Sequence, residues 1–185
     1  MLDLLPDFPL HPRGPAAATC LAHGLRDYRS AAAHVAALPY GRGLARDDLA
    51  ILDERRGTCS TKHALLARLA AEHHVPVALI LGIYLMDGSN TPGVGDALAA
   101  HGLTALPEAH CVLRWRAHTI DLTRPNITAL PTFLHDQPIS PDDIVHRKLE
   151  IHRQFLTTWL PTHLPGWTLE SLWRAREACI AALAD

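Results

Sequence analysis

Cys59 occupies a position in the sequence where a cysteine can act as a nucleophile. It stands between Thr58 and Ser60, shortly before the run 64–70, whose alanine, leucine and arginine residues favour a helix. Gly57 allows a sharp turn into that helix, and Thr58 or Ser60 can cap it. The unpaired N–H groups and the positive dipole of a helix start stabilise a thiolate. We therefore expect a reactive thiol at Cys59, and the alternative is a small buried cysteine.

A thiolate nucleophile needs a base that can also return a proton, and a group that holds the base in place. Histidine is the usual base, and three histidines are candidates here: His63, His110 and His118. His63 lies four residues after Cys59 and can face it on the helix. No acid lies beyond His63 to orient its ring, so this arrangement predicts an ion pair rather than a complete catalytic unit.

Two strands predicted on either side of Arg116-Ala117 provide a base together with an acid. If these two residues form the turn of a hairpin, His110 and Asp121 lie on one face as diagonal neighbours. His118 then falls on the opposite face from Asp121. Arg-Ala is not a favoured turn pair, and a three-residue loop would reverse the register. The hairpin predicts a His110–Asp121 pair, with two solvated strand residues as the alternative.

The order of these features resembles the transglutaminase-like superfamily. Its motif blocks are matched by Gly57-Thr58-Cys59, by Ala109-His110-Cys111-Val112 and by Ile120-Asp121-Leu122-Thr123. The resemblance covers roughly residues 45–125. It implies a papain-like α+β core in which Cys59 is the nucleophile, His110 is base and acid, and Asp121 orients His110.

Most of the chain also resembles small bacterial proteins of this superfamily that have no assigned activity. The matching segments are Gly57–His63, Asn90–Gly95, Pro107–Cys111 and Leu172–Ile180. This resemblance indicates the family and leaves the substrate open.

Five further residues are candidates for substrate contacts: His63, Asn90, Thr91, Glu108 and Tyr40. Asn90 and Thr91 belong to a turn-rich loop, which can line a cleft or simply form a turn. Glu108 is a candidate partner for a cationic substrate group, or else it only begins a strand. The Cys59 backbone N–H is expected in the oxyanion hole. Tyr40 is a candidate second donor, with a packed core tyrosine as the alternative.

The hydrophobic pattern and the breaker residues predict an α+β fold. A nucleophile helix is expected to pack on an antiparallel sheet, with further helices flanking it at both ends of the chain. We expect one domain over residues 1–185, with a core at about 45–125 and a C-terminal helical part at about 140–184. Helices are predicted at about 16–38 (with Gly24 as a candidate break), 59–74, 96–101, 140–160 and 168–183, strands at 75–86, 109–115 and 118–123, and irregular chain at 125–137.

Composition and charge limit the kinds of partner that the protein is expected to bind. The chain has 185 residues, is 48% hydrophobic and carries a formal net charge of -2, which gives no electrostatic reason to expect nucleic acid or an acidic membrane as partner. It contains no apolar run of about 18 residues, and an acid stands near its start where a signal peptide is basic. We expect a cytoplasmic protein with free thiols. Neither a CxxC pair nor an acidic calcium loop is present, so no metal or cofactor is expected.

The favoured function is a thiol enzyme that transfers or hydrolyses acyl groups of a peptide-like or other amide substrate. One alternative is a non-catalytic binding module of the same fold. Another is a metal site built from Cys59, His63 and His110. The sequence names neither the acyl donor and acceptor nor any protein partner.

Overall fold

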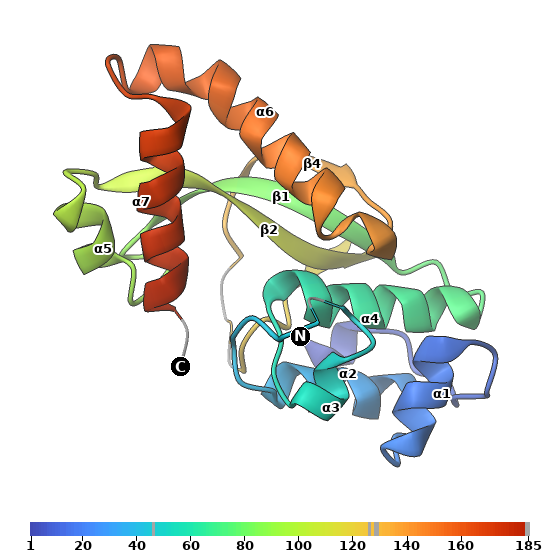
Figure 1. Cartoon of the computed structure of the whole chain (residues 1–185). Helices are drawn as coiled ribbons and strands as arrows, with labels where there is room; N and C mark the ends of the chain where they lie inside the picture. The colour runs from blue at the N-terminus through green and yellow to red at the C-terminus, as the bar shows by residue number, and fades with distance from the viewer. Residues whose placement is uncertain (46, 126, 128–129, 184–185) are drawn as a thin grey trace.

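The computed structural model describes residues 1–45, 47–125, 127 and 130–183. Over these residues the chain forms seven α-helices and one four-stranded antiparallel sheet, which confirms the predicted α+β class (Figure 1). The helical elements are η1 (Leu2–Leu4), α1 (Pro15–Ala22), α2 (Tyr28–Ala37), α3 (Ile51–Glu54), α4 (Cys59–Glu72), α5 (Gly95–Ala100), η2 (Pro141–Asp143), α6 (His146–His163) and α7 (Leu169–Ala182). The strands are β1 (Ala78–Asp87), β2 (Ala105–Trp115), β3 (His118–Ile120) and β4 (Phe133–Pro138), and they lie side by side in the order β3-β2-β1-β4.

Helices cover the sheet from both sides. In Figure 1, α1 to α4 lie below the sheet, α6 runs along its upper side, and α5 and α7 stand at its left end. Contacts agree with this view, because α4 packs on β1 and β2, while α6 and α7 both pack on β2. Strand β2 therefore touches three helices that come from distant parts of the sequence.

The first long helical segment is divided where the sequence offered a break. Gly24 has a φ of +79°, a left-handed conformation that favours glycine, and it separates α1 from α2. The central helix, α4, begins at Cys59 because Thr58 caps it. The Thr58 side chain accepts a hydrogen bond from the Thr61 N–H, and the Thr61 side chain accepts one from the Thr58 N–H. This reciprocal cap fixes the start of α4 at the candidate nucleophile.

The β2–β3 hairpin has the register that the two-residue turn predicts. Leu113 pairs with Ile120 and Trp115 with His118, so only Arg116 and Ala117 lie between the strands. Arg116 adopts a φ of +54°, in the left-handed region that residues other than glycine and asparagine rarely adopt. The hairpin thus closes through an unfavourable turn residue, and the packed strands on either side hold it there.

Strand β4 corrects the prediction of irregular chain over 125–137. It pairs with the edge of β1, and four of its six residues are exposed, so its sequence lacks the apolar alternation that marks a strand. Phe133 packs against β1 and against the second apolar cluster of the fold. Its ring lies so close to Gly82 that a Cβ at this glycine would overlap it. The missing side chain at Gly82 is therefore what allows β4 to close over β1.

The C-terminal helices form nearly as predicted. The segment predicted as one helix over 140–160 consists of η2 followed by α6, and α6 continues past Pro161 to His163. Pro161 itself has no N–H to donate, so the last turn of α6 forms without that one hydrogen bond and the helix ends soon afterwards. Thr168 caps α7 through the same reciprocal arrangement that Thr58 makes at α4.

Apolar side chains gather in two clusters on either side of the candidate site. One joins the N-terminal helices and α4 to the sheet, and its members include Leu65, Leu81 and Leu113. The other joins the far end of the sheet to α5, α6 and α7, and its members include Met86 and Leu172. Helix α6 contributes to both clusters, with Ile151 in the first and Leu156 in the second.

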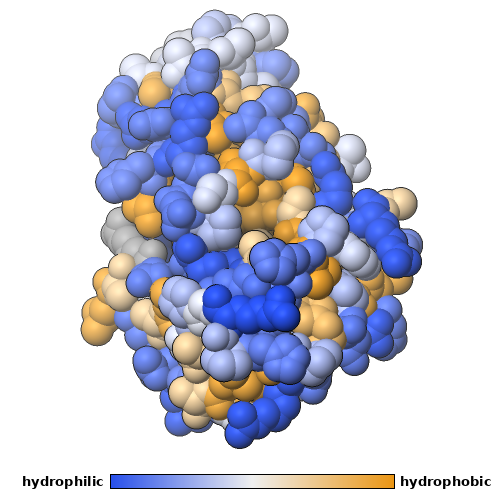
Figure 2. Space-filling model, turned by 90° about the vertical axis from the view of Figure 1, so that its right-hand side faces the viewer, coloured by the Kyte–Doolittle hydropathy of each residue, from blue (hydrophilic) through white to orange (hydrophobic). Residues whose placement is uncertain are grey.

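The surface is mixed in character. On the face drawn in Figure 2, hydrophilic residues cover most of the area and apolar atoms show between them. The large apolar residues that remain exposed come from separate parts of the described chain: Leu4, Leu44, Leu85, Leu130 and Leu134. No described helix is both long enough and apolar enough to cross a bilayer.

Gly82→Ala should destabilise the protein, because the added methyl group forces the Phe133 ring away from β1. Overpacking of this kind costs about 1–3 kcal/mol of unfolding free energy. Gly41→Ala is the matched control, since its Cβ would meet only the Arg56 side chain at 3.8 and 3.9 Å. Urea denaturation of both variants measures the difference, and equal stabilities would show that Phe133 does not anchor β4.

Candidate active site

Cys59 is the first residue of α4 and is nearly buried, with 6% of its surface exposed. The residue that precedes it, Thr58, is the helix cap, so the Cys59 backbone N–H belongs to the first turn and has no partner within the helix. The thiol therefore has an unpaired backbone donor beside it, at the positive end of the helix dipole.

His110 and Asp121 form the pair that the hairpin register predicted. His110 lies on β2, and Asp121 follows the last residue of β3. The His110 Nε2 and the Asp121 Oδ2 are 2.6 Å apart. The second carboxylate oxygen, Oδ1, accepts a hydrogen bond of 2.8 Å from the Thr123 N–H. The carboxylate is thus held at both oxygens and orients the imidazole.

The electrostatics favour a thiolate–imidazolium pair. Burial alone would raise the pKa of the Cys59 thiol, but the charges of Lys148 and His110 and a hydrogen bond from His110 lower that pKa to about 6. Burial would likewise lower the pKa of His110, but the charges of Asp121 and Cys59 raise it well above its ordinary value. Because Asp121 engages Nε2, Nδ1 is the ring nitrogen that is left for Cys59. Near neutral pH, Cys59 is therefore a thiolate and His110 an imidazolium.

His63 lies in the interior and not in the cleft where a substrate contact was predicted. It is fully buried, and both ring nitrogens are bonded to the backbone. Nδ1 donates to the Cys59 carbonyl over 2.7 Å, and Nε2 accepts from the Leu122 N–H over 2.8 Å. Burial lowers the pKa of His63 to about 4, which keeps the ring neutral. His63 therefore ties the start of α4 to the segment that carries Asp121.

Lys62 makes a second tie between the same segments. Its side chain is fully buried, and Nζ donates to the carbonyl oxygens of Leu38 at 2.6 Å and Thr123 at 2.7 Å. Burial lowers the pKa of Lys62 to about 8. Together with His63, it fixes the position of Asp121 relative to Cys59.

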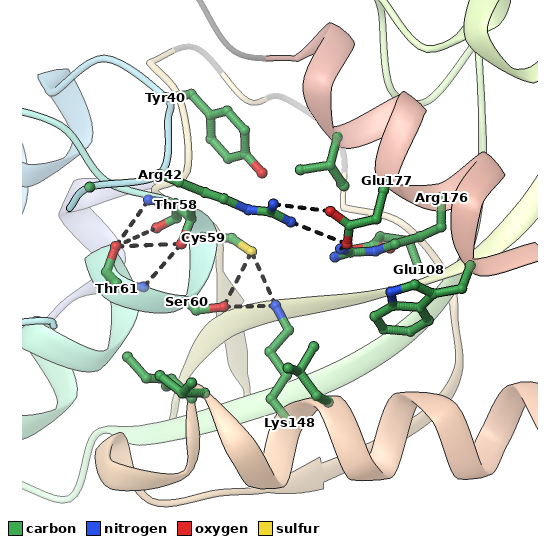
Figure 3. Close-up of a pocket in the computed structure, with 16 residues that line it drawn as sticks. Tyr40, Arg42, Thr58, Cys59, Ser60, Thr61, Glu108, Lys148, Arg176 and Glu177 are labelled. Atoms are coloured by element: carbon green, nitrogen blue, oxygen red, sulfur yellow. Dashed lines mark hydrogen bonds and ion pairs between the residues drawn. The ribbon is translucent and has the colours of Figure 1, made fainter. Parts of the chain in front are cut away.

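Lys148 is a residue of the site that sequence reasoning missed. It projects from α6 and is 7% exposed, with Nζ 2.7 Å from the Ser60 Oγ and 3.8 Å from the Cys59 Sγ (Figure 3). Its sequence position carries a usable signal. Lys148, Ile151, His152 and Leu156 are all buried, which is the inward stripe of an amphipathic helix. A lysine within such a stripe needs a buried partner.

Glu108 does not have a free carboxylate, contrary to its predicted role as a partner for a cationic substrate group. Arg176 of α7 donates to both of its oxygens, over 2.8 and 2.6 Å. Burial would raise the pKa of Glu108, but Arg176 outweighs burial and lowers it. Arg176 also donates to Glu177, which in turn accepts from Arg42. Figure 3 shows Arg42 reaching over Cys59 toward Glu177.

The other predicted contact residues all line cavities next to Cys59. Tyr40 is half-buried, and Figure 3 shows its hydroxyl directed into the site. Burial raises the pKa of Tyr40, so its phenol remains a hydrogen-bond donor. Thr91 shares a hydrogen bond of 2.9 Å with the Tyr84 hydroxyl. The Asn90 amide bonds to the Leu85 carbonyl and therefore also shapes the turn.

Two cavities meet at Cys59. The first, of about 310 Å³, is lined by residues of the loop 40–43, the start of α4, α6 and α7. The second, of about 250 Å³, is lined by residues of the loop 90–92, by the sheet and by the segment after β3. Cys59 belongs to the walls of both, whereas His110 and Asp121 line only the second. A molecule bound at the thiol can therefore extend in two directions.

The remaining thiols, all in the described chain, have different surroundings. Cys20, Cys111 and Cys179 are buried and form no disulfide, and the Cys111 thiol donates to the Ser60 Oγ over 3.6 Å. Burial raises the pKa of each, to about 12 for Cys20. A metal site at Cys59, His63 and His110 is disfavoured because His63 uses both nitrogens on the backbone. Within the described residues no other group of three histidine, cysteine or acidic side chains is placed to hold a metal ion.

Comparison with known proteins adds no relative. No family model, no curated protein and no solved structure matches the chain.

Iodoacetamide should label Cys59 selectively. Because the Cys59 pKa is lowered to about 6, its thiolate persists down to about this pH, and its alkylation rate should fall only in more acidic solution. The other three thiols stay protonated up to alkaline pH. Mass spectrometry of each cysteine between pH 5 and 9 provides the measurement, and equal labelling of Cys59 and Cys20 at pH 6 would contradict the assignment.

Proposed function

We propose that the protein is a cysteine-dependent acyltransferase or hydrolase with Cys59 as nucleophile, His110 as acid and base, and Asp121 as the group that orients His110. One observation carries this proposal. A thiol with a lowered pKa at a helix start shares a histidine with a buried carboxylate, at 2.6 Å between Nε2 and Oδ2. Each group has the partner that nucleophilic catalysis requires.

Acylation begins when the Cys59 thiolate attacks the carbonyl carbon of an amide. A C–S bond forms, and the π electrons of the carbonyl move onto its oxygen. The Cys59 backbone N–H stands ready as one donor to that oxyanion. When the intermediate collapses, the C–N bond breaks, and the imidazolium of His110 gives its proton to the departing amine. A thioester on Cys59 and a neutral His110 remain.

Deacylation reverses the roles of the same groups. Water or an amine attacks the thioester carbonyl, and His110 takes the proton of the attacking group. The C–S bond then breaks, and its electrons return to Cys59 as the thiolate. The product is a carboxylic acid with water, or a new amide with an amine. Asp121 stabilises the imidazolium each time it forms.

The arrangement of elements supports a transglutaminase-like, papain-like core as part of the proposal. The nucleophile starts a helix that packs on β1 and β2, the base lies on β2, and the acid follows the hairpin partner β3. The order along the chain is Cys59, His110 and Asp121, which is the order of the motif blocks in that superfamily. The proposed substrate is a peptide or a small amide.

The cavities suggest where the two parts of the substrate lie. His110 must reach the departing amine, and it lines the second cavity, so the leaving group is placed there. The acyl part then extends into the first cavity, between α6 and α7. Tyr84 packs its ring edge-on against His110 with 5.8 Å between ring centroids, which keeps the imidazole directed at this boundary.

His110→Ala and Asp121→Ala should each reduce the rate at which p-nitrophenyl acetate acylates Cys59, by about 100-fold or more. The double variant should be little slower than the worse single variant, since Asp121 acts only through the imidazole. Mass spectrometry of acetylated Cys59, with Cys59→Ser as background, measures the rate.

His118→Ala is the matched control for these variants. His118 is exposed on β3 and pairs with Trp115, away from the thiol, so its loss should leave acylation unchanged. Circular dichroism confirms that each variant is folded. Losses at His110 and Asp121 that multiply in the double variant would show that the two residues act independently, against the proposal.

A further inference from the structure

We infer that Lys148 is a catalytic residue that stabilises the oxyanion formed when Cys59 attacks a carbonyl, and this inference rests on the function proposed above. Lys148 has the required position. Its Nζ lies 3.8 Å from the Cys59 Sγ and lines the first cavity. An ammonium group carries three N–H donors. One is engaged by the Ser60 Oγ at 2.7 Å, so the others face the sulfur and the cavity.

The anchoring of α6 holds this ammonium group in place before any substrate binds. His152 lies one turn after Lys148 on the same buried stripe, and its Nε2 donates to the Pro107 carbonyl of β2 over 2.9 Å. Ser60, the second residue of α4, fixes the other end of the side chain. Donors held in place in this way cost no reorganisation when charge develops in the transition state.

The path of the negative charge explains why a fixed cation belongs here. The charge starts on Sγ, moves to the carbonyl oxygen in the tetrahedral intermediate, and leaves that oxygen when the thioester forms. The oxygen is separated from Sγ by only two bonds, so an ammonium group beside the sulfur is also near the oxyanion. His110 cannot provide this stabilisation throughout, because it gives its proton to the leaving group. Lys148 keeps its charge during the whole sequence.

The other cations that line the first cavity in the described chain already have carboxylate partners. Arg176 bonds both oxygens of Glu108, and Arg42 bonds Glu177. Lys148 differs from them because its charged neighbour is the nucleophile itself. Burial alone would lower the pKa of Lys148, but the negative charges of Cys59 and Glu108 raise it above its ordinary value. The ammonium group therefore persists at the pH at which the thiolate reacts.

Lys148→Met tests the inference when two reactions of Cys59 are compared. Alkylation by iodoacetamide needs the thiolate but forms no oxyanion, whereas acylation by p-nitrophenyl acetate needs both. The ratio of the acylation rate to the alkylation rate cancels the fraction of thiolate. We expect this ratio to fall about 100-fold, the usual loss when one oxyanion donor is removed. Lys148→Arg keeps the charge and should stay within about tenfold of the wild type.

The pH dependence separates two effects of the Lys148 ammonium group: it lowers the pKa of Cys59, and it is proposed to stabilise the oxyanion. The titratable groups around Cys59 in the described chain come from every element packed against it: Lys62 from α4, Tyr84 from β1, His110, Glu108 and Cys111 from β2, Asp121 after β3, Lys148 from α6, Arg176 from α7 and Tyr40 from its loop. Loss of Lys148 should move the alkylation profile to higher pH, because the thiolate loses a cation. The lowered ratio should persist at pH 9.5, where thiolate formation no longer limits either reaction.

Arg147→Met is the matched control, since Arg147 precedes Lys148 on α6 but its side chain is 56% exposed. It removes one positive charge from the same helix and should leave the ratio unchanged. Should Lys148→Met fail to fold, Lys148→Gln removes the charge while keeping a hydrogen-bond donor to Ser60.

Three outcomes are informative. A ratio that falls in Lys148→Met and recovers in Lys148→Arg supports the inference. An unchanged ratio overturns it, and a fall in Tyr40→Phe instead would assign the oxyanion to that phenol. If wild-type Cys59 is acylated no faster than the Cys59→Ser background, the proposed function itself is wrong, and the inference fails with it.

Discussion

A negative charge held inside the protein at Cys59 is the constraint on which the rest of the structure depends. A buried ion is tolerated only where opposite charges and hydrogen bonds compensate for lost water. His110 supplies one such charge from β2, and Lys148 supplies another from α6. The buried thiolate is therefore stabilised by groups that surround it only while α4, β2 and α6 are assembled. A second buried ion pair, between Glu108 of β2 and Arg176 of α7, lies next to these charges and holds α7 at the site. Four elements converge because each contributes a charge that the others need.

Two further buried side chains complete this assembly by fixing distances. His63 and Lys62 use their polar atoms on backbone groups, at Cys59, Leu122, Leu38 and Thr123. These bonds set the separation between the helix start and the segment that carries Asp121. The pKa of His63 is lowered by burial, so the ring adds no charge to the site. The neutral ring of His63 thus supplies geometry, whereas the ring of His110 supplies a charge.

Local patterns were sufficient for the helix start and for the hairpin. The Gly57–Ser60 run marks the first turn of α4, and the spacing of His110 and Asp121 places them on one face once the turn length is known. Other features depend on contacts between distant segments and leave no local signal. Strand β4 is mostly exposed, so its pairing with β1 follows from the bare surface at Gly82 rather than from its own composition. Lys148 does leave a local signal, because it falls on the apolar stripe of α6, but its partners Cys59 and Ser60 follow only from the packing of α6 on the sheet. The burial of Arg176 likewise follows from the packing of α7 on β2.

The position of Cys59 in a wall common to two cavities has a consequence for specificity. In the proposed reaction, His110 must both protonate the amine that leaves and deprotonate the molecule that replaces it. Both events occur on the side of the thiol where His110 lies. The departing and arriving groups therefore occupy the same space in turn, while the acyl group remains on the other side. Any selectivity built into that space applies equally to both groups, so in the proposed reaction the amines that are accepted should resemble those that are released. The proposed acyl site lies between α6 and α7, so its selectivity can change independently of the selectivity for the amine.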